Sequence, residues 1–208
     1  MANREEKSRF DLYVKDVDRG TEELVVKGFG GYQIPYWFEN SLLLLDFRIH
    51  EDTTIYRVDL RNGKLTELTP HVGEAVFTPI GSWRNGFFMV ADENRDFKSL
   101  AFYDLDKKNY KIVWEGKWDV ERADIGDKYL LFSVNEEGYS KLYSLNLETF
   151  KISEIDIPEG VIFNISAAPG RDIFYIQLSK PTHPLNVYVV DLEEEKFGVD
   201  IMEVQEII

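Results

Sequence analysis

The 208-residue sequence contains no cysteine, which excludes disulfide bonds, thiolate metal ligands and a cysteine nucleophile. It has no apolar run near the roughly 18 residues that cross a bilayer. Basic residues are outnumbered by acidic ones, 24 against 38, and the net charge of −14 argues against nucleic acid and membrane surfaces as partners. The first ten residues carry charges but no apolar core, so we expect no signal peptide and a cytoplasmic location.

Apolar and aromatic residues, at 44% and 14%, are abundant enough to exclude a disordered chain. Part of them belongs to a short pattern that returns five times: an aliphatic residue, then usually Tyr, then any two residues, then Asp or Asn followed by Val or Leu. The Asp or Asn of this pattern, which we call the anchor, lies at Asp16, Asp59, Asp104, Asn146 and Asp191. The intervals of 43, 45, 42 and 45 residues indicate a repeat protein.

Four segments of each complete repeat have the composition of β-strands. One strand contains the pattern, a second follows a turn after the anchor, and an apolar run with a further strand before it lies upstream. Gly or Asn in the turns after the anchors suits the positive φ of a short hairpin loop. The apolar runs contain few polar residues, which predicts strands buried on both faces; they are 42–47, 87–91, 129–134 and 173–178.

Four strands in about 43 residues, repeated evenly, are typical of an all-β propeller with four-stranded antiparallel blades, whereas a sandwich does not repeat one pattern at this interval. The chain then forms a single propeller domain, or a fragment of one, over residues 1–208. Its first half blade lacks two strands, so the ring either stays open or is completed by a larger propeller. The predicted half blade is 9–27, and the complete blades are 31–69, 74–115, 118–156 and 161–202.

Side chains that recur once per repeat are expected to have structural roles. Each anchor is expected to accept hydrogen bonds from backbone N–H groups in the turn that follows it. The pattern tyrosines Tyr56, Tyr143 and Tyr188 are expected to pack between blades with their rings largely buried. The four tryptophans do not recur at one position; most are expected between blades, with one or two as candidates for a channel lining: Trp37, Trp83, Trp114 and Trp118.

No catalytic motif is visible. A hydrolase nucleophile elbow requires Gly-x-Ser-x-Gly before a helix, and the nearest match, Gly138-Tyr139-Ser140, lacks the second Gly and enters a strand. The three histidines, His50, His71 and His183, fall in predicted loops, where a solvated side chain is expected. We therefore predict no catalytic residue, no cofactor-binding residue and no metal ligand in this chain, and we assign no substrate-channel residue.

Two acidic clusters resemble calcium-binding loops in composition. Asp16-Val17-Asp18 and Asp92-Glu93-Asn94 lack the spacing of oxygen ligands, with Gly at the sixth position, that a calcium loop requires. We interpret both as turns. Glu193, Glu194 and Glu195 are expected to form a solvated hairpin.

The last repeat resembles a known family. Residues 168–176 read Ala-Pro-Gly-Arg-Asp-Ile-Phe-Tyr-Ile, and residues 186–192 read Asn-Val-Tyr-Val-Val-Asp-Leu. These resemble the "SPDGxxIAFxS…xxLYVVDL" repeat of TolB-like propellers and of the N-terminal propellers of prolyl-oligopeptidase-family serine peptidases, including acylaminoacyl-peptidase-like enzymes. Residues 126–147 are similar more loosely, whereas 83–86 and 39–40 depart from the repeat.

The resemblance implies a non-catalytic propeller that gates or selects peptides for an α/β-hydrolase peptidase domain, with the catalytic Ser, His and Asp outside this sequence. TolB-like propellers imply the alternative, a docking module for protein partners. The expected partners are thus a hydrolase domain or another protein, together with peptides. Self-association through open strand edges is a further expectation. A propeller glycosidase, which needs separated carboxylates, ranks last.

Overall fold

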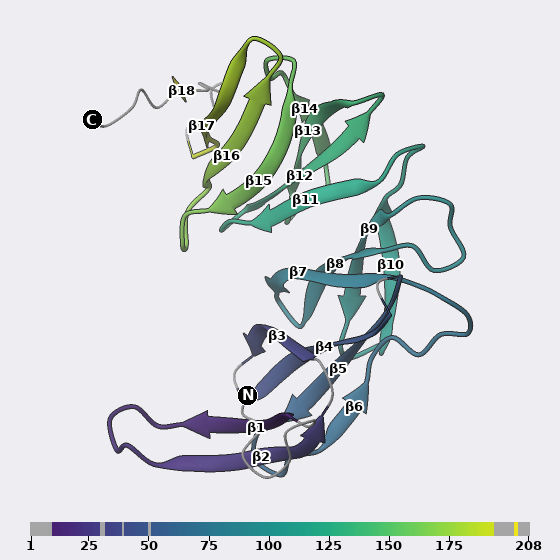
Figure 1. Ribbon diagram of the computed structural model, residues 1–208, viewed down its shortest axis with the longest axis vertical. Coiled ribbons are helices and arrows are strands. Elements are labelled where there is room, and N and C mark those ends of the chain that lie inside the picture. Colours follow the sequence, from purple (N-terminus) through teal and green to yellow (C-terminus); the bar gives the residue numbers. More distant parts are fainter. Residues whose placement is uncertain (1–9, 30–31, 39, 50, 194–201, 204–208) are drawn as a thin grey trace. The chain divides into compact units, whose positions relative to one another are not determined.

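The computed structural model describes residues 10–29, 32–38, 40–49, 51–193 and 202–203. Every regular element within these ranges is a β-strand, and the strands form five antiparallel sheets (Figure 1). Nowhere in these ranges is there a helix of the length and apolarity that a membrane span requires.

The strands follow one another in sequence order within every sheet, so each four-stranded sheet is a meander. The first sheet pairs β1 (Phe10–Lys15) with β2 (Glu22–Phe29). The second contains β3 (Tyr32–Phe38), β4 (Ser41–Ile49), β5 (Asp52–Asp59) and β6 (Leu65–Glu67). The third contains β7 (Phe77–Trp83), β8 (Gly86–Ala91), β9 (Ser99–Asp104) and β10 (Asn109–Trp114). The fourth contains β11 (Val120–Ile125), β12 (Tyr129–Glu136), β13 (Tyr139–Asn146) and β14 (Ile152–Ile155). The fifth contains β15 (Val161–Ala167), β16 (Ile173–Lys180), β17 (His183–Asp191) and β18 (Met202–Glu203).

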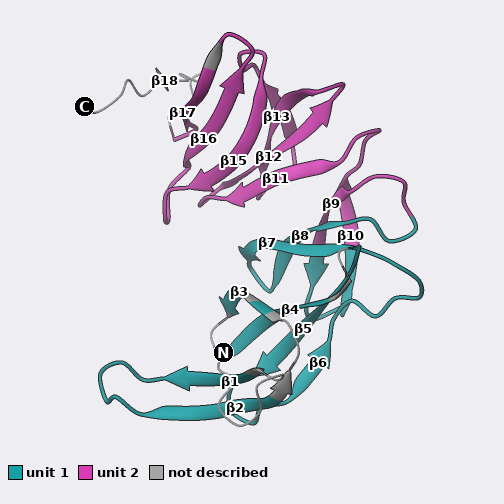
Figure 2. Cartoon of the chain, viewed as in Figure 1, with its two compact units in different colours: residues 1–94, 103–110 teal, residues 95–102, 111–208 magenta. Residues whose placement is uncertain are grey.

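A two-stranded sheet followed by four four-stranded antiparallel sheets confirms the predicted fold class. The backbone contacts divide the chain into two compact units, each described by itself below (Figure 2). Unit 1 comprises Met1–Asn94 and Tyr103–Tyr110, and unit 2 comprises Arg95–Phe102 and Lys111–Ile208. The assignment of the whole chain to a single domain stays a prediction.

Each anchor organises the turn after it: four anchors end the third strand of a four-stranded sheet, and Asp16 follows β1 of the two-stranded sheet. A side-chain oxygen of Asp16 accepts hydrogen bonds at 3.0 Å from the backbone N–H groups two and three residues on. The same pair of bonds recurs at Asp104 and Asn146. Asp59 and Asp191 accept from the N–H group two residues on, at 2.9 Å each. The predicted turn-forming role is confirmed at all five anchors.

The position four residues after the anchor has a left-handed backbone in four of these turns. Gly20 and Gly63 adopt it as predicted, each with φ of 66°. In the third and fourth sheets it falls on Lys108 (φ 54°) and Phe150 (φ 57°), and not on the Asn or Thr beside them. The distance from the anchor therefore sets the position, even though a residue with a Cβ costs about 1–2 kcal/mol there.

The second strand of each sheet was predicted to be buried on both faces. All of β8 is buried, as are residues 42–45 of β4 and 130–134 of β12, whereas the prediction is wrong for Phe47 of β4, which is 40% exposed. The prediction is wrong for β16, where Phe174 and Ile176 are fully buried but Tyr175 is 44% exposed. One face of β16 packs on the fourth sheet and the other meets solvent.

Apolar clusters join neighbouring sheets within each unit. In unit 1, Leu12 of β1 packs with Leu42, Leu44 and Val58 of the second sheet. In unit 2, residues of the fourth sheet such as Leu131 pack with the inner face of the fifth. Burial of this apolar surface is the main force that holds sheet to sheet.

The pattern tyrosines are buried to different extents. Tyr188 is 3% exposed, as predicted, whereas Tyr56 and Tyr143 are mostly covered but keep part of the ring exposed. Tyr143 nevertheless lies between sheets, with its ring centroid 5.3 Å from Phe132 and 5.8 Å from Trp114.

Candidate functional site

The part of the chain that the structure describes holds no group of three or more His, Asp or Glu side chains placed to bind a metal ion. The candidates are therefore the side chains singled out in the sequence and the polar networks around them.

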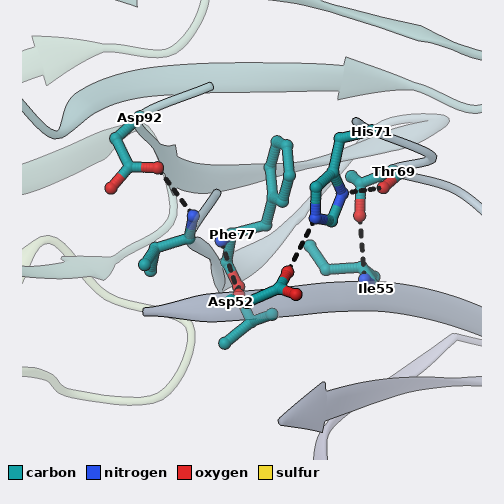
Figure 3. A network of polar contacts seen from close by, with 8 residues as sticks. Asp52, Ile55, Thr69, His71, Phe77 and Asp92 are labelled. Atoms are coloured by element: carbon teal, nitrogen blue, oxygen red, sulfur yellow. Dashed lines mark hydrogen bonds and ion pairs between the residues drawn. The ribbon is translucent and has the colours of Figure 1, made fainter. Parts of the chain in front are cut away.

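One such network surrounds His71, in the loop between β6 and β7 of unit 1 (Figure 3). The His71 side chain is fully buried. Its Nε2 lies 2.8 Å from Asp52 Oδ1, and its Nδ1 lies 2.8 Å from the Thr69 carbonyl oxygen. The ring also contacts Phe77, at 5.3 Å between centroids. The prediction of a solvated His71 is wrong, because these two oxygens supply the polar contacts that a buried imidazole needs.

This geometry argues against catalysis by His71. A carbonyl oxygen can only accept, so Nδ1 carries a proton toward Thr69. The second ring nitrogen, Nε2, lies 2.8 Å from Asp52 Oδ1, so both ring nitrogens are engaged by protein oxygens. Neither nitrogen is available to take a proton from a nucleophile. The pair therefore has the composition of a catalytic pair but the geometry of a structural one.

Ser140, the nearest match to a nucleophile elbow, is buried in unit 2. Its hydroxyl oxygen accepts the backbone N–H of Ile162, on the next sheet, at 2.8 Å. Thr53 of unit 1 does the same for Phe77, at 2.6 Å. Each lies six residues before its anchor, and the backbone N–H of each also donates to a carbonyl of the following segment. The hydroxyl groups tie the third strand of one sheet to the first strand of the next, which supports a structural role for Ser140.

The acidic side chains weighed as calcium ligands bind protein groups. Asp92 accepts the backbone N–H of Val76 at 2.6 Å, and Glu93 accepts the hydroxyl of Tyr110 at 2.5 Å. Asp16 caps its own turn, as interpreted from the sequence. Their oxygens therefore have structural partners within unit 1.

Shifted pKa values mark ion pairs at turns. Arg171 binds both carboxylate oxygens of Glu193, at 2.9 and 2.6 Å, and this hydrogen bonding lowers the pKa of Glu193 and raises that of Arg171. The side-chain hydrogen bond from Lys107 likewise lowers the pKa of Asp104. These groups lie at the surface, where such pairs contribute little to stability. Of the predicted acidic hairpin, Glu193 is exposed, whereas 194 and 195 lie outside the described residues.

The remaining histidines add no described site. His50 lies outside the described residues, and His183 begins β17 with a side chain that is not described. Their predicted solvation stays a prediction.

The tryptophans divide into two groups. Trp114 packs between the third and fourth sheets, against Phe132 at 5.3 Å, as predicted. Trp83 is half-buried, with Arg84 stacked on its ring at 4.2 Å. Trp37 and Trp118 do not pack between sheets; they are 58% and 38% exposed and lie on an edge strand and in a loop, and a channel-lining role for one or two tryptophans stays a prediction.

Three polar side chains that the sequence did not single out tie the fourth sheet to the fifth. Asp172 is 4% exposed, and its Oδ1 accepts the backbone N–H groups of Lys128 and Tyr129 at 2.8 and 3.0 Å. Asp124 and Arg122, both on β11, bind the backbone of β15. Asp172 ends the Pro-Gly-Arg-Asp turn of the family-like repeat, which was the available signal. Asp124 and Arg122 recur in no other repeat, so no sequence pattern could have identified them.

Repeated four-stranded meanders, tied face to face, define a protein of the β-propeller class. Comparison with known families matches residues 74–185, more than half of the chain, to the dipeptidyl peptidase IV (DPP IV) N-terminal region. The chain belongs to this family. No curated protein matches it significantly over its sequence.

Solved structures of peptidases and of TolB have the same fold. A prolyl endopeptidase matches with a TM-score of 0.74 and 16% identity, over 88% of this chain and 28% of its own. Dipeptidyl peptidase 4 of Porphyromonas gingivalis matches with a TM-score of 0.67 and 15% identity, over 94% and 29%. TolB of Acinetobacter baumannii matches with a TM-score of 0.68 and 15% identity, over 95% and 49%. The chain thus spans less than a third of either peptidase and about half of TolB, and the resemblance drawn from the last repeat is confirmed.

Proposed function

We propose that this chain is the propeller part of a prolyl-oligopeptidase-family serine peptidase, where it selects peptide substrates for an attached α/β-hydrolase domain. The observation that carries the proposal is the match of residues 74–185 to the N-terminal region of a peptidase family. The buried Ser140 and the doubly bonded His71 leave the chemistry to another domain.

The selection acts by steric exclusion. A propeller beside a hydrolase active site admits flexible peptides and rejects folded proteins, because a folded substrate cannot pass a rigid wall of sheets. Hydrogen bonds between neighbouring sheets, such as the one from the Lys128 backbone N–H to Asp172, make the wall of sheets rigid. The peptides and the hydrolase domain are the proposed partners.

A second candidate is a docking module that works through protein contacts alone. The likeness to TolB over 95% of this chain supports this candidate. Self-association through open strand edges, such as those of the two-stranded β1–β2 sheet, belongs with this candidate, because unpaired strand edges recruit other chains. A cytoplasmic location is proposed for both, and cell fractionation tests it.

Labelling of the native protein separates the two candidates. An antibody against this chain is used to detect it in extracts of cells that make it, after treatment with a fluorophosphonate probe for active-site serines. We expect the antibody to detect a polypeptide longer than this chain that carries the probe. A probe-free polypeptide that co-purifies with no labelled hydrolase would refute the peptidase role and favour docking.

The selection itself is tested on the labelled enzyme. The hydrolase domain with and without this chain is given a short peptide and a folded protein that contains the same cleavable sequence. We expect removal of the propeller to raise cleavage of the folded protein relative to the peptide. An unchanged ratio would contradict steric selection.

A further inference from the structure

Arg122 lies at the edge of the fourth sheet with its guanidinium held in place. It is the third residue of β11, an edge strand that runs beside β15 in the same direction (Figure 1). Its Nε donates to the Phe163 carbonyl oxygen and its Nη1 donates to the Glu121 carbonyl oxygen, each at 2.8 Å. Two main-chain carbonyls thus orient the group, but neither carries a charge that neutralises it.

Arg122 differs in this respect from three arginines that lie beside carboxylates, whereas Arg57 binds the Ser41 hydroxyl and Arg84 stacks on Trp83. Arg171 binds Glu193, Arg95 binds Glu115, and Arg19 lies 3.8 Å from Asp16. Among the described residues, no carboxylate lies within the 4.0 Å of an ion pair from Arg122, although acidic residues outnumber basic ones 38 to 24. A planar guanidinium that is fixed and exposed, with N–H groups to spare, suits a carboxylate supplied from outside.

Irregular strand pairing exposes an apolar side chain next to this charge. The register of β11 with β12 skips residue 121, and the register of β15 with β16 skips Phe163. A bulge of this kind turns a side chain away from the direction that regular alternation gives it. Phe163 is 53% exposed as a result, and Asn164 after it is exposed as well. The two bulges place a cation and an aromatic ring on adjacent strands, joined through the Phe163 carbonyl.

We propose that Arg122 and Phe163 form a peptide-binding site, in which Arg122 binds a carboxylate of the peptide and Phe163 packs against a neighbouring apolar side chain. The carboxylate comes from the C-terminus of the peptide or from an acidic residue within it. The ring favours a peptide over an inorganic anion, and the net charge of −14 disfavours nucleic acid. The inference rests on the proposed function, because that function makes peptides the ligands.

Fluorescence anisotropy with three labelled peptides tests the site on the 208-residue chain. The first is Ala-Ala-Phe-Ala with a free C-terminal carboxylate, the second is its C-terminal amide, and the third is amidated Ala-Ala-Phe-Glu. We expect the amide without Glu to bind at least about tenfold more weakly than a carboxylate-bearing peptide. Binding of the first peptide assigns the C-terminus as the source, and binding of the third assigns the acidic side chain. Equal binding of all three would overturn the proposal.

Variants separate recognition from general charge. Arg122→Gln is expected to weaken the carboxylate-bearing peptide at least about tenfold, to the level of the amide. Arg171→Gln changes the net charge equally but removes an arginine that binds Glu193, and it should leave binding unchanged. If both variants lose affinity alike, the effect is non-specific and the site is refuted.

The peptide affinity of Phe163→Ala tests the site independently of whether the Arg122 variant folds. The substitution keeps the carbonyl that Arg122 binds, so the strands stay tied. We expect affinity for the Phe-containing peptides to fall about threefold to tenfold with little change in thermal stability. Unchanged affinity would overturn the role of the ring. A chain that binds none of the peptides, yet is found attached to a labelled serine hydrolase, would refute this site while the proposed function stands.

Discussion

Asp172 is a sensitive point in the contact between the fourth and fifth sheets. Its carboxylate is buried, and one oxygen accepts both the Lys128 and the Tyr129 backbone N–H groups, at 2.8 and 3.0 Å. Replacement by Ala would leave these two donors in the sheet contact without their acceptor. Replacement by Asn would keep an oxygen at the same place but remove its charge.

The size of the effect follows from the two bonds. A hydrogen bond to a charged group contributes about 1.5–3 kcal/mol, and half-buried donors recover part of this from water. We expect Asp172→Ala to lower the free energy of unfolding by about 2–4 kcal/mol. Charge-assisted bonds are roughly twice as strong as neutral ones, so Asp172→Asn should lose about half as much.

Gly126 offers an independent way to disturb the same contact. A Cβ added there would lie 2.7 Å from the Arg171 carbonyl oxygen and 2.7 Å from Asp172 Oδ1, closer than atoms tolerate. Gly126→Ala should therefore push the turn away and destabilise unit 2. Because both variants break one contact, the double variant should lose less than the sum of the two single losses.

Urea denaturation followed by tryptophan fluorescence measures the global effect, and hydrogen exchange at the Tyr129 amide measures the local one. Asp127→Ala is the matched control, since Asp127 is exposed and precedes the same donors; it should change stability by less than about 0.5 kcal/mol. An Asp172→Ala variant that is as stable as this control, with unchanged protection of Tyr129, would refute the reasoning.

Four further predictions test other parts of the structure. Ser140→Ala should lower the free energy of unfolding by about 1–3 kcal/mol, because a buried backbone N–H loses its acceptor, and peptidase assays of the chain should detect no turnover before or after the change. His71→Ala should cost about 2–4 kcal/mol in urea melts, because two hydrogen bonds and a buried ring are lost; stability equal to the parent would contradict the network. The lowered pKa of Glu193 means that its ion pair contributes above the ordinary Glu pKa near 4.3 and is lost as the pH falls through the lowered value; in NMR titrations Arg171→Gln should return that pKa toward normal. Hydrogen exchange should be faster in β1 and β2 than in β5 at low protein concentration, and slow exchange in both at every concentration would show that the two-stranded sheet has a stable neighbour.

The strand order and the turns could be predicted because their causes lie within a few residues. The anchors Asp16 and Asn146 accept N–H groups only two and three residues on, so any copy of the pattern forms the same turn. The even interval then places a similar meander in every repeat. Even here, Lys108 and Phe150 show that geometry overrides residue preference, since both adopt the backbone expected of Gly.

The environment of each candidate side chain could not be predicted in this way. His71 has the sequence context of a solvated loop, and only the contact with Asp52, 19 residues earlier, makes it a buried, hydrogen-bonded ring. The exposure of Tyr175 depends on whether a further sheet covers β16. Arg122 follows an ordinary strand pattern until the bulge and the Phe163 carbonyl turn it toward the neighbouring strand.

By itself, the sequence determined the repeat, the order of strands within each sheet and the residues that form the turns, since these depend on hydrogen bonds and periodicity within one repeat. Only the tertiary structure decided which polar groups became ties between sheets, which apolar faces were covered and which arginines were paired with carboxylates. These outcomes depend on contacts between residues about 20 to 45 positions apart, such as Asp172 with Lys128, and a single repeat contains only one side of each contact.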